Sequence, residues 1–426
     1  MAKTEEFIKK IETGEYDERL IDIYIDKDKL SEQKSRYSQA LKAFTELFGD
    51  DADAIFSAPG RSEIGGNHTD HQHGEVLCAS INDDAIAIVK KTDKNEVNIL
   101  SKGYDMITVA LDKLEKDKSQ EGTTLALIKG VIAGVKTHGF NIGGFDAYVT
   151  SNVLSGSGLS SSAAFETLIG TILSGLYNDM NISPIEIAII GQYAENAYFG
   201  KPCGLMDQMA CSVGSLCHID FADPSKPSVS KVEFDMDAAG YSLCITDTKG
   251  SHADLTPDYA AVPAEMKAVA AHFGKTVLYE VSEEDVIKNA SAIREECGDR
   301  AFLRAIHFYE ENKRVKKEVG ALNAKDINTF LATVADSGNS SFKYLQNVYT
   351  NHNVECQNMS VGLMMSEMNL GINGVARVHG GGFAGTIQAF VKNDAVESYK
   401  KSMDDIFGEG SCNVLKIRKY GGIKVM

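Results

Sequence analysis

Histidines and a carboxylate crowd the segment NHTDHQHG, where His68, Asp70, His71 and His73 could together hold zinc or iron. Their spacing argues against a metal, because the chain has no HExxH pair and an HxHxDH motif would need a histidine at Gly66. A polar turn without a ligand is the other interpretation of this segment taken alone.

A glycine- and serine-rich segment, GSGLSSSAA, runs from Gly156 to Ala164 between a strand-like stretch and a helical one. The amides and the positive dipole end of a helix start attract anions, and glycine lets a phosphate reach the backbone. The segment is no dinucleotide-binding GxGxxG, since Ser161 takes the third glycine position, and the GKT at 274–276 has Val269 where a Walker A loop needs its first glycine. A nucleophile elbow fails too, with Ser162 in place of its last glycine. The segment therefore predicts either a phosphate cradle or an ordinary serine helix cap.

Two more segments contain residues suited to chemistry. In AENAYFGKPCGLMDQ, Asp207 stands among apolar residues, where a carboxylate is costly unless a charge or a metal compensates it. Asp207 is therefore either at the surface or functional, and Glu195 precedes it on the same stretch. In VHGGGFAGT, residues 378–386, the glycines indicate a backbone turn that packs tightly or approaches a ligand.

Predicted strands and helices separate these segments. Short runs typical of strands predict a sheet in the first half of the chain, at 54–58, 85–89, 97–100 and 145–150. One helix is expected to begin near Ser160. A second should begin after Ser183, which caps it, with Pro184 in its first turn and Glu186 completing a capping box. This second helix should end near Phe199 and Gly200.

The turn-rich segment FADPSKPSVSK, residues 221–231, is the best candidate for a domain boundary, because its prolines and serines interrupt both periodicities. We expect one domain at residues 1–225, which begins with a charged, amphipathic helical extension at 1–50, and a second at 226–426. The second should contain a strand at YSLCITDT, several helices, and strands on either side of Gly380 to Gly382.

The 426-residue chain has 43 Lys and Arg against 60 Asp and Glu, a formal charge of −17. Such a surface repels nucleic-acid phosphates and anionic lipids, so we expect function in a pocket and a local device for any phosphate. The eight cysteines form no CxxC pair, the N-terminus lacks an apolar signal core, and no stretch reaches the ~18 apolar residues of a membrane helix. These features predict a cytoplasmic protein without nucleic-acid or membrane partners. They leave the oligomeric state open, with a monomer as one option.

In their order, the four segments resemble the motifs of the GHMP kinases, and among these the galactokinases. PGRSEIGGNHTDHQHGEVL is similar to the galactokinase signature PGRVNLIGEHTDYxxGxVL, GSGLSSSAA to the phosphate loop GxGLSSSAS, and GKPCGLMDQ to GxPCGxMDQ. HGGGFAGT is similar to the third GHMP motif, TGGGFGGC. The resemblance runs from about Ala40 to the C-terminus. It implies an α+β fold of two lobes, the first like ribosomal protein S5 domain 2 and the second ferredoxin-like, with the active site between them.

The resemblance also implies that the protein phosphorylates the anomeric hydroxyl of a galactose-type sugar with ATP and Mg2+. Asp207 matches the catalytic aspartate, and Arg61 matches the basic partner that holds the attacking oxygen and the transferring phosphoryl group. Ser162 and Glu195 match the magnesium ligands. The implied sugar-binding residues are Asn67, His68, Asp70, Gly204 and Tyr259, and the implied ATP-binding residues are Gly156, Ser157, Gly158, Leu159, Ser160, Ser161, Ser162 and Ala163.

Three residues depart from the galactokinase pattern. Asn67 replaces a glutamate that contacts the C6 hydroxyl, His71 replaces a tyrosine, and Glu63 replaces an asparagine. Loss of a carboxylate beside C6 removes repulsion against a uronic acid, and HTDHQ resembles the HxDHQ of galacturonate kinases. No new Lys or Arg in the segment could pair with a substrate carboxylate, so galactose stays the first expectation, ahead of galacturonate or another galactose-like hexose. A non-catalytic sugar sensor is a further alternative, which the intact catalytic and magnesium positions disfavour.

Overall fold

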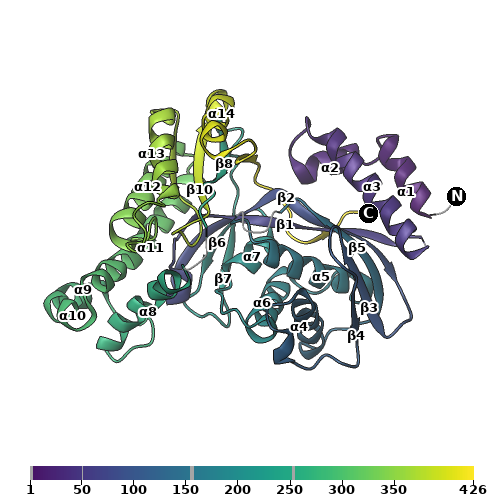
Figure 1. The fold of residues 1–426 in the computed structure, drawn as a ribbon, viewed down its shortest axis with the longest axis horizontal. Coiled ribbons are helices and arrows are strands. Elements are labelled where there is room, and N and C mark those ends of the chain that lie inside the picture. Colours follow the sequence, from purple (N-terminus) through teal and green to yellow (C-terminus); the bar gives the residue numbers. More distant parts are fainter. Residues whose placement is uncertain (1–2, 50, 154–157, 252–254) are drawn as a thin grey trace.

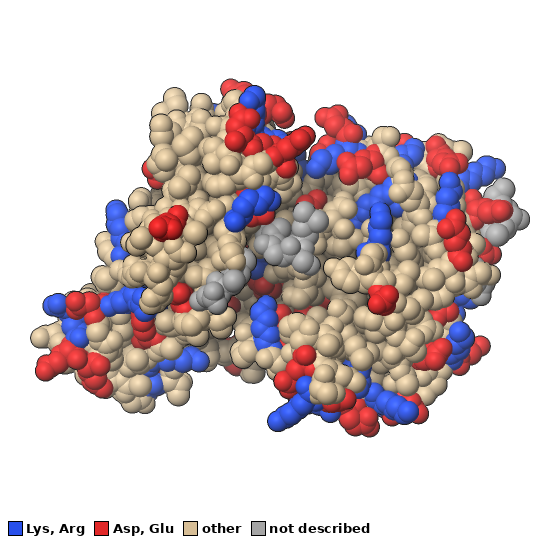
Figure 2. Space-filling view, in the orientation of Figure 1, with Lys and Arg blue, Asp and Glu red and all other residues tan. Residues whose placement is uncertain are grey.

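The computed structural model describes residues 3–49, 51–153, 158–251 and 255–426 of the chain. Figure 1 shows two lobes side by side, each built on its own β-sheet and covered by helices. The surface is hollowed where the two lobes meet, and charged side chains of both signs are spread over the face shown in Figure 2.

The first lobe is built on an eight-stranded sheet in which only the β3–β5 pair is parallel among the described strands. The order is β12-β1-β2-β5-β3-β4, and β6, followed by β7, pairs with the first part of the long β2. Its strands are β1 (Ala54–Gly65), β2 (Glu75–Lys91), β3 (Glu96–Ser101), β4 (Ile107–Ala110), β5 (Phe145–Ser151), β6 (Leu216–Asp220), β7 (Ser228–Val232) and β12 (Ile423–Lys424).

Both faces of this sheet are buried, and the side chains of β2 alternate between them. Ala85, Ala87 and Val89 pack with the helices of one face, and Ile86 and Ile88 pack with the N-terminal helices on the other. The first face is covered by α4 (Thr124–Thr137), α5 (Ser161–Tyr177) and α6 (Pro184–Ala194), while α7 (Met206–Val213) packs against β1 and β2 nearer the second lobe.

The N-terminal extension is helical, as expected for residues 1–50. It forms three helices, with left-handed backbone at Gly14 between the first and second and at Ile25 between the second and third. They are α1 (Lys3–Glu12), α2 (Asp17–Tyr24) and α3 (Leu30–Phe48). Their apolar residues, including Tyr37 and Phe44, are buried against the sheet, so this segment covers the face that α4 to α6 leave open.

The second lobe contains a four-stranded antiparallel sheet in the order β11-β8-β10-β9. Helices from the second half of the chain surround it (Figure 1). Its strands are β8 (Tyr241–Asp247), β9 (Gly374–Val378), β10 (Thr386–Lys392) and β11 (Cys412–Leu415). Its longer helices are α8 (Thr256–His272), α9 (Glu283–Lys288), α10 (Ala290–Cys297), α11 (Asp299–Asn323), α12 (Ile327–Ser340), α13 (Asn358–Leu370) and α14 (Val396–Phe407).

The two sheets are not divided at the expected position. The boundary at 225/226 falls inside the turn that joins β6 to β7, and both strands belong to the first sheet. The chain passes to the second sheet between Val232 and Tyr241, and the C-terminal β12 returns to pair with β1 of the first. The prolines and serines do mark a turn, but such residues occur equally in a hairpin turn and in a linker between domains.

The helix that leads toward the site has one of its two predicted caps. Ser183 Oγ accepts a hydrogen bond from the backbone N–H of Glu186 at 3.2 Å, as expected. The carboxylate of Glu186 is hydrogen-bonded to His138, the residue directly after α4, instead of returning to the backbone of Ser183, so the capping box is incomplete. A π-helical turn, Glu195–Phe199, extends the helix, and Gly200 ends it with a φ of 83°.

Candidate active site

Arg61 and Asp207 meet as a two-pronged ion pair. Arg61 lies on β1 at a bulge, where the pairing with β2 shifts between Pro59 and Arg61, and Asp207 lies in the first turn of α7. Arg61 Nε donates to Asp207 Oδ1 at 2.6 Å and Nη2 donates to Oδ2 at 2.7 Å, a geometry that arginine forms with carboxylates. Burial alone would raise the pKa of Asp207, but the charge and hydrogen bonds of Arg61 outweigh it and lower that pKa. Asp207 is therefore ionised and can accept a proton.

The glycine- and serine-rich segment joins this pair. Ser160 Oγ donates to Asp207 Oδ2, and Arg61 Nη1 donates to the carbonyl of Gly158. Gly158 and Ser160 have positive φ values of 71° and 56°, and α5 begins at the next residue, Ser161. The N-terminal end of a 17-residue helix thus lies beside Arg61, which suits an anion. Gly156 and Ser157, predicted to bind ATP, lie outside the described residues.

The glycine- and serine-rich segment has four further described residues that were predicted to bind ATP: Leu159, Ser161, Ser162 and Ala163. Leu159 and Ala163 are buried and hold it in the core, while Ser161 and Ser162 are half-buried in the first turn of α5. The carbonyl of Leu159 accepts from the backbone N–H of Arg61 at 3.1 Å, so the segment is also fixed to β1.

Ser162 and Glu195 face each other across the two helices that carry them. Ser162 Oγ lies 3.3 Å from Glu195 Oε1, and the other carboxylate oxygen, Oε2, accepts from Gln208 Nε2 at 2.8 Å. A hydroxyl and a carboxylate are hard oxygen donors of the kind that magnesium takes, usually one or two from the protein. The pair therefore fits the ion that the resemblance implies.

Three residues around Glu195 were not singled out from the sequence. Gln208 Nε2 also donates to Glu166 Oε2 at 3.1 Å, so the amide joins two buried carboxyl groups. Burial and the negative charge of Glu195 raise the pKa of Glu166 well above its ordinary value, which favours its protonated form. Lys201 Nζ lies 3.1 Å from Glu195 Oε1. Two signals were available in the sequence: Glu166 is one helical turn after Ser162, and Gln208 follows Asp207 directly.

The histidines of the signature segment form a hydrogen-bonded series rather than a metal site. His68 Nε2 donates to the carbonyl of Gly381 at 3.0 Å, and His68 Nδ1 lies 3.4 Å from His71 Nε2. His71 Nδ1 in turn accepts from Gln72 Nε2 at 3.2 Å. Burial lowers the pKa of His68 to about 4 and that of His71 well below its ordinary value, so both rings are neutral. Among the described residues, no three His, Cys, Asp or Glu side chains are grouped to hold a metal.

Asp70 and Gly204 are in close contact. A Cβ on Gly204 would clash with Asp70 Oδ2, so any other residue there would displace the Asp70 carboxyl group. Burial and the negative charge of Asp207 raise the pKa of Asp70 to about 6. Tyr259 lies on α8 and donates its hydroxyl to the carbonyl of Gly382 at 2.6 Å. His68 and Tyr259 thus contact the motif HGGGFAGT, and Asp70 lies against the motif GKPCGLMDQ.

Asn67, the remaining predicted sugar-binding residue, is fully buried, and its side chain has protein partners on both sides. Its Nδ2 donates to Glu63 Oε1 at 2.9 Å and to the carbonyl of Gly380 at 2.7 Å, and its Oδ1 accepts from Asn347 Nδ2 at 2.9 Å. This side chain links the two lobes, and a direct contact with sugar stays a prediction.

The third motif packs onto the glycine- and serine-rich segment. A Cβ on Gly158 would lie 2.5 Å from Thr386 Oγ1 and 3.2 Å from His379 Nδ1. His379 Nε2 lies 3.1 Å from Ser62 Oγ, beside Arg61. All four segments selected in the sequence therefore meet between the lobes.

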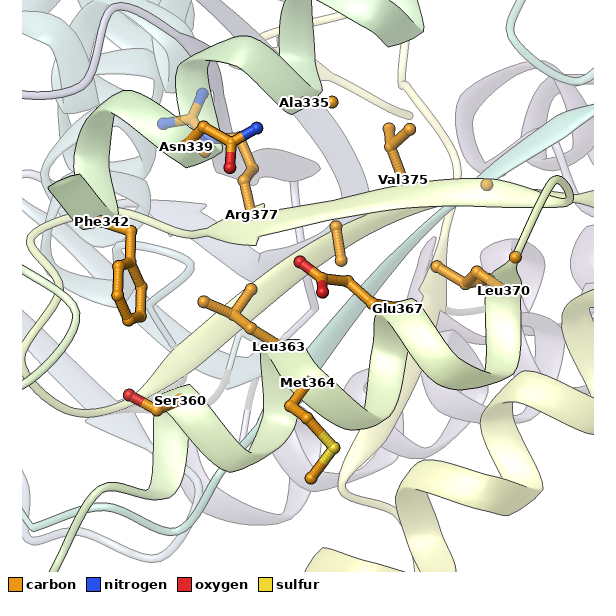
Figure 3. Close-up of a pocket in the computed structure, with 14 residues that line it drawn as sticks. Ala335, Asn339, Phe342, Ser360, Leu363, Met364, Glu367, Leu370, Val375 and Arg377 are labelled. Carbon is orange, nitrogen blue, oxygen red and sulfur yellow. The ribbon is translucent and has the colours of Figure 1, made fainter.

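A cavity of about 440 Å3 elsewhere in the second lobe is separate from this site. It lies between α12, α13 and β9 and is lined by apolar side chains such as Leu363 and Val375 and by charged ones, Glu367 and Arg377 (Figure 3). None of the predicted site residues lines it.

In the described part of the chain, no helix is long and apolar enough to cross a membrane.

Comparison with known proteins first identifies the class. Residues 126–215 match the family model of the GHMP kinase N-terminal domain, a range that contains Glu195, Asp207 and the segment before α5. Residues 42–91, which contain Arg61 and the histidines, match the galactokinase galactose-binding signature. The fold and these two matches are those of a GHMP kinase.

Individual relatives narrow this class. The chain is 32% identical to a galactokinase of Clostridium beijerinckii over 84% of this chain and 90% of the relative. It is 29% identical to a galactokinase of Streptomyces coelicolor over 85% of this chain and 91% of the relative. The crystal structure of Lactococcus lactis galactokinase complexed with galactose, 27% identical, matches 90% of this chain and 98% of that one with a TM-score of 0.76. The chain belongs to the galactokinase family, which confirms the predicted family and the two-lobed α+β fold.

Proposed function

We propose that the protein transfers the γ-phosphoryl group of ATP to the anomeric hydroxyl of galactose, giving galactose 1-phosphate and ADP. The observation that carries this proposal is the Arg61–Asp207 ion pair, joined by hydrogen bonds to Ser160 and Gly158 at the start of α5. A proton acceptor, a cation and a helix start suited to phosphate thus lie together in a member of the galactokinase family.

The chemistry follows from the charges of this cluster. Asp207 is ionised and accepts the proton of the sugar hydroxyl as the oxygen attacks the γ-phosphorus. Arg61 orients Asp207 and stabilises negative charge on the phosphoryl oxygens during transfer. The amides at the start of α5 bind the nucleotide phosphates, which the overall charge of −17 would otherwise repel.

Magnesium would be held by Ser162 and Glu195, and it would neutralise phosphate charge during the transfer. Gln208 keeps Glu195 in place by donating to Oε2, which leaves Oε1 toward Ser162. Glu166 supports Gln208 through a further hydrogen bond, and its protonated state avoids a second negative charge beside Glu195.

We assign sugar binding to the surroundings of His68, Asp70, Gly204 and Tyr259. Neutral histidines and a carboxyl group can donate to and accept from hydroxyl groups without requiring a charged substrate. A site with many such groups discriminates strongly, because a sugar that lacks one hydroxyl leaves a buried partner unpaired. The crystal structure of the Lactococcus lactis enzyme contains galactose, which supports the same sugar here. A cytoplasmic location accords with the eight free cysteines.

An ADP-release assay with galactose, galacturonate, N-acetylgalactosamine, glucose and arabinose tests this proposal. We expect the highest kcat/KM for galactose. A higher kcat/KM for galacturonate would replace galactose as the substrate while leaving the reaction unchanged. Tight binding of sugar and ATP without release of ADP would identify a sensor instead of a kinase.

A further inference from the structure

Lys201 is an unexpected neighbour of the magnesium site. It occupies the variable position of the GxPCGxMDQ motif, directly after the glycine that ends the π-helical turn. The backbone N–H of Lys201 donates to the carbonyl of Glu195 at 3.2 Å, so this turn brings the lysine back over Glu195. Its ammonium group then lies 3.1 Å from Glu195 Oε1.

The lysine holds the oxygen that a metal ion would need. Gln208 already donates to Glu195 Oε2, whereas Oε1 faces Ser162. A divalent ion bound by Ser162 and Glu195 would therefore compete with the ammonium group for Oε1. The two side chains also differ in freedom: that of Glu195 is 3% exposed, and that of Lys201 is 63% exposed. The carboxylate is fixed, and the lysine is the partner that can move.

We propose that Lys201 is a mobile nucleotide-binding residue that pairs with Glu195 before the nucleotide arrives and with a phosphate oxygen afterwards. A divalent ion that enters with the nucleotide takes Oε1, and the released ammonium group turns to the phosphate beside it. The inference rests on the proposed function, because it requires phosphates at the start of α5.

The charge balance of the site supports this assignment. Arg61 is a cation in contact with the segment before α5, because its Nη1 donates to the carbonyl of Gly158, but its Nε and Nη2 are bonded to Asp207. Within the described residues, the other ion pair at Asp207 or Glu195 is that of Lys201. A nucleoside triphosphate brings several negative charges, which Arg61 alone does not neutralise. A second cation that can change partners would bind one of the remaining phosphate oxygens. An ordinary exposed ion pair, by contrast, would contribute little and would affect neither ligand.

Two binding measurements on Lys201→Met test the proposal without relying on turnover. Titration of Mn2+ in the absence of nucleotide, followed by electron paramagnetic resonance, reports on the metal site. We expect roughly 2- to 5-fold tighter Mn2+ binding, because an exposed ion pair no longer competes for Glu195. Calorimetric titration with a non-hydrolysable ATP analogue and Mg2+ reports on the phosphate contact. We expect roughly 10- to 100-fold weaker binding, because a charge-assisted hydrogen bond is lost.

Two further variants serve as controls. Lys201→Arg keeps the charge and should retain most of the nucleotide affinity. Lys419→Met removes a matched lysine, 65% exposed and 2.9 Å from Asp22, and should change neither measurement.

Opposite shifts for the two ligands support the proposal. Unchanged binding of both ligands would reduce Lys201 to a surface ion pair, and shifts in the same direction would indicate a disturbed turn; either result overturns it. If the wild-type protein binds no ATP analogue, the proposed function itself fails.

Discussion

Glu63 and Asn67 carry a carboxyl group and an amide in exchanged places relative to the galactokinase signature. The structure brings the two side chains together, with Asn67 Nδ2 donating to Glu63 Oε1 at 2.9 Å. Arg377 Nη2 donates to the same oxygen at 2.9 Å, yet burial still raises the pKa of Glu63 to about 7. The two departures therefore compensate each other: the carboxyl group has moved by four residues and stays within one hydrogen-bonded pair.

The variant Asn67→Glu tests this compensation. It would place two carboxyl groups against each other in a buried site, so the free energy of unfolding should fall by on the order of 3 kcal/mol. The double variant Glu63→Asn, Asn67→Glu restores one carboxyl and one amide and should regain most of that loss. Urea unfolding at pH 8 measures both, and a double variant as unstable as the single one would refute the compensation.

The role of Asp207 is tested by Asp207→Asn. The amide cannot accept the hydroxyl proton, so turnover should fall by roughly 10²- to 10⁴-fold, the contribution of a positioned base. Galactose affinity, measured by calorimetry, should stay close to that of the wild type because the side chain keeps its size. Normal turnover in this variant would exclude Asp207 as the base.

Motif residues were predictable from the sequence because their spacing along the chain is characteristic. Arg61, Asp207, Ser162 and Glu195 do lie together in the structure. Glu166 and Gln208 were near motif residues in the sequence, but their contacts depend on how two helices cross, and that of Lys201 depends on a π-helical turn; neither feature has a sequence period.

Among the elements, the glycine- and serine-rich segment before α5 packs against the third motif, HGGGFAGT, at Gly158. A side chain there would meet Thr386 Oγ1, and the positive φ already disfavours any residue with a Cβ. Gly103, in the turn between β3 and β4, has a φ of 86°, and a Cβ added there would have no neighbour within 4 Å. A substitution at Gly103 would therefore introduce backbone strain alone, whereas one at Gly158 would introduce both backbone strain and a steric contact.

Gly158→Ala should raise the KM for ATP by at least about tenfold, since a ~1.4 kcal/mol disturbance of the segment suffices for that. Gly103→Ala should cost only about 1–2 kcal/mol of stability, for the left-handed backbone, and leave the KM unchanged. Steady-state kinetics and thermal unfolding of both variants measure this. Equal effects on KM would show that the contact with the third motif is unimportant.

Strand and helix predictions succeeded where one local pattern decides the outcome. The runs at 54–58 and 85–89 lie within β1 and β2, and Ser183 caps α6 as expected. The boundary at 225/226 was misplaced because the choice between a hairpin and a linker depends on whether β7 pairs with β6. The pairing of β12 with β1 could not be predicted from local patterns either, because it joins residues about 370 apart in the chain.

For the whole molecule, Asp84 on β2 is the point where the N-terminal helices, the first sheet and the C-terminal segment meet. It accepts hydrogen bonds from Tyr24 Oη at 2.8 Å, Arg36 Nη1 at 2.6 Å and Arg418 Nη1 at 3.0 Å. Burial would raise the pKa of Asp84, but the charges of Arg36 and Arg418 lower it below the ordinary value of 3.8. The N-terminal extension is thus fixed to the lobe by buried charge as well as by apolar packing.

Asp84→Asn should lower the free energy of unfolding by about 3–5 kcal/mol at neutral pH, because two buried arginines lose their counter-charge. Because the folded pKa is lowered, this contribution is present above the unfolded pKa and is lost as pH falls through the folded value. The difference between variant and wild type should therefore shrink at acid pH. Urea unfolding at pH 7 and pH 3.5 checks both points, and a difference that grows at pH 3.5 would contradict the assignment.

The position of phosphate in the product tests the proposed chemistry most directly. After incubation of galactose with ATP and Mg2+, two-dimensional proton–phosphorus NMR reports which sugar carbon carries the new ester. The proposed transfer to the anomeric hydroxyl predicts phosphate on C1, formed by the wild-type protein and nearly lost in Asp207→Asn. An ester on C6, or release of inorganic phosphate without a sugar phosphate, would contradict the account.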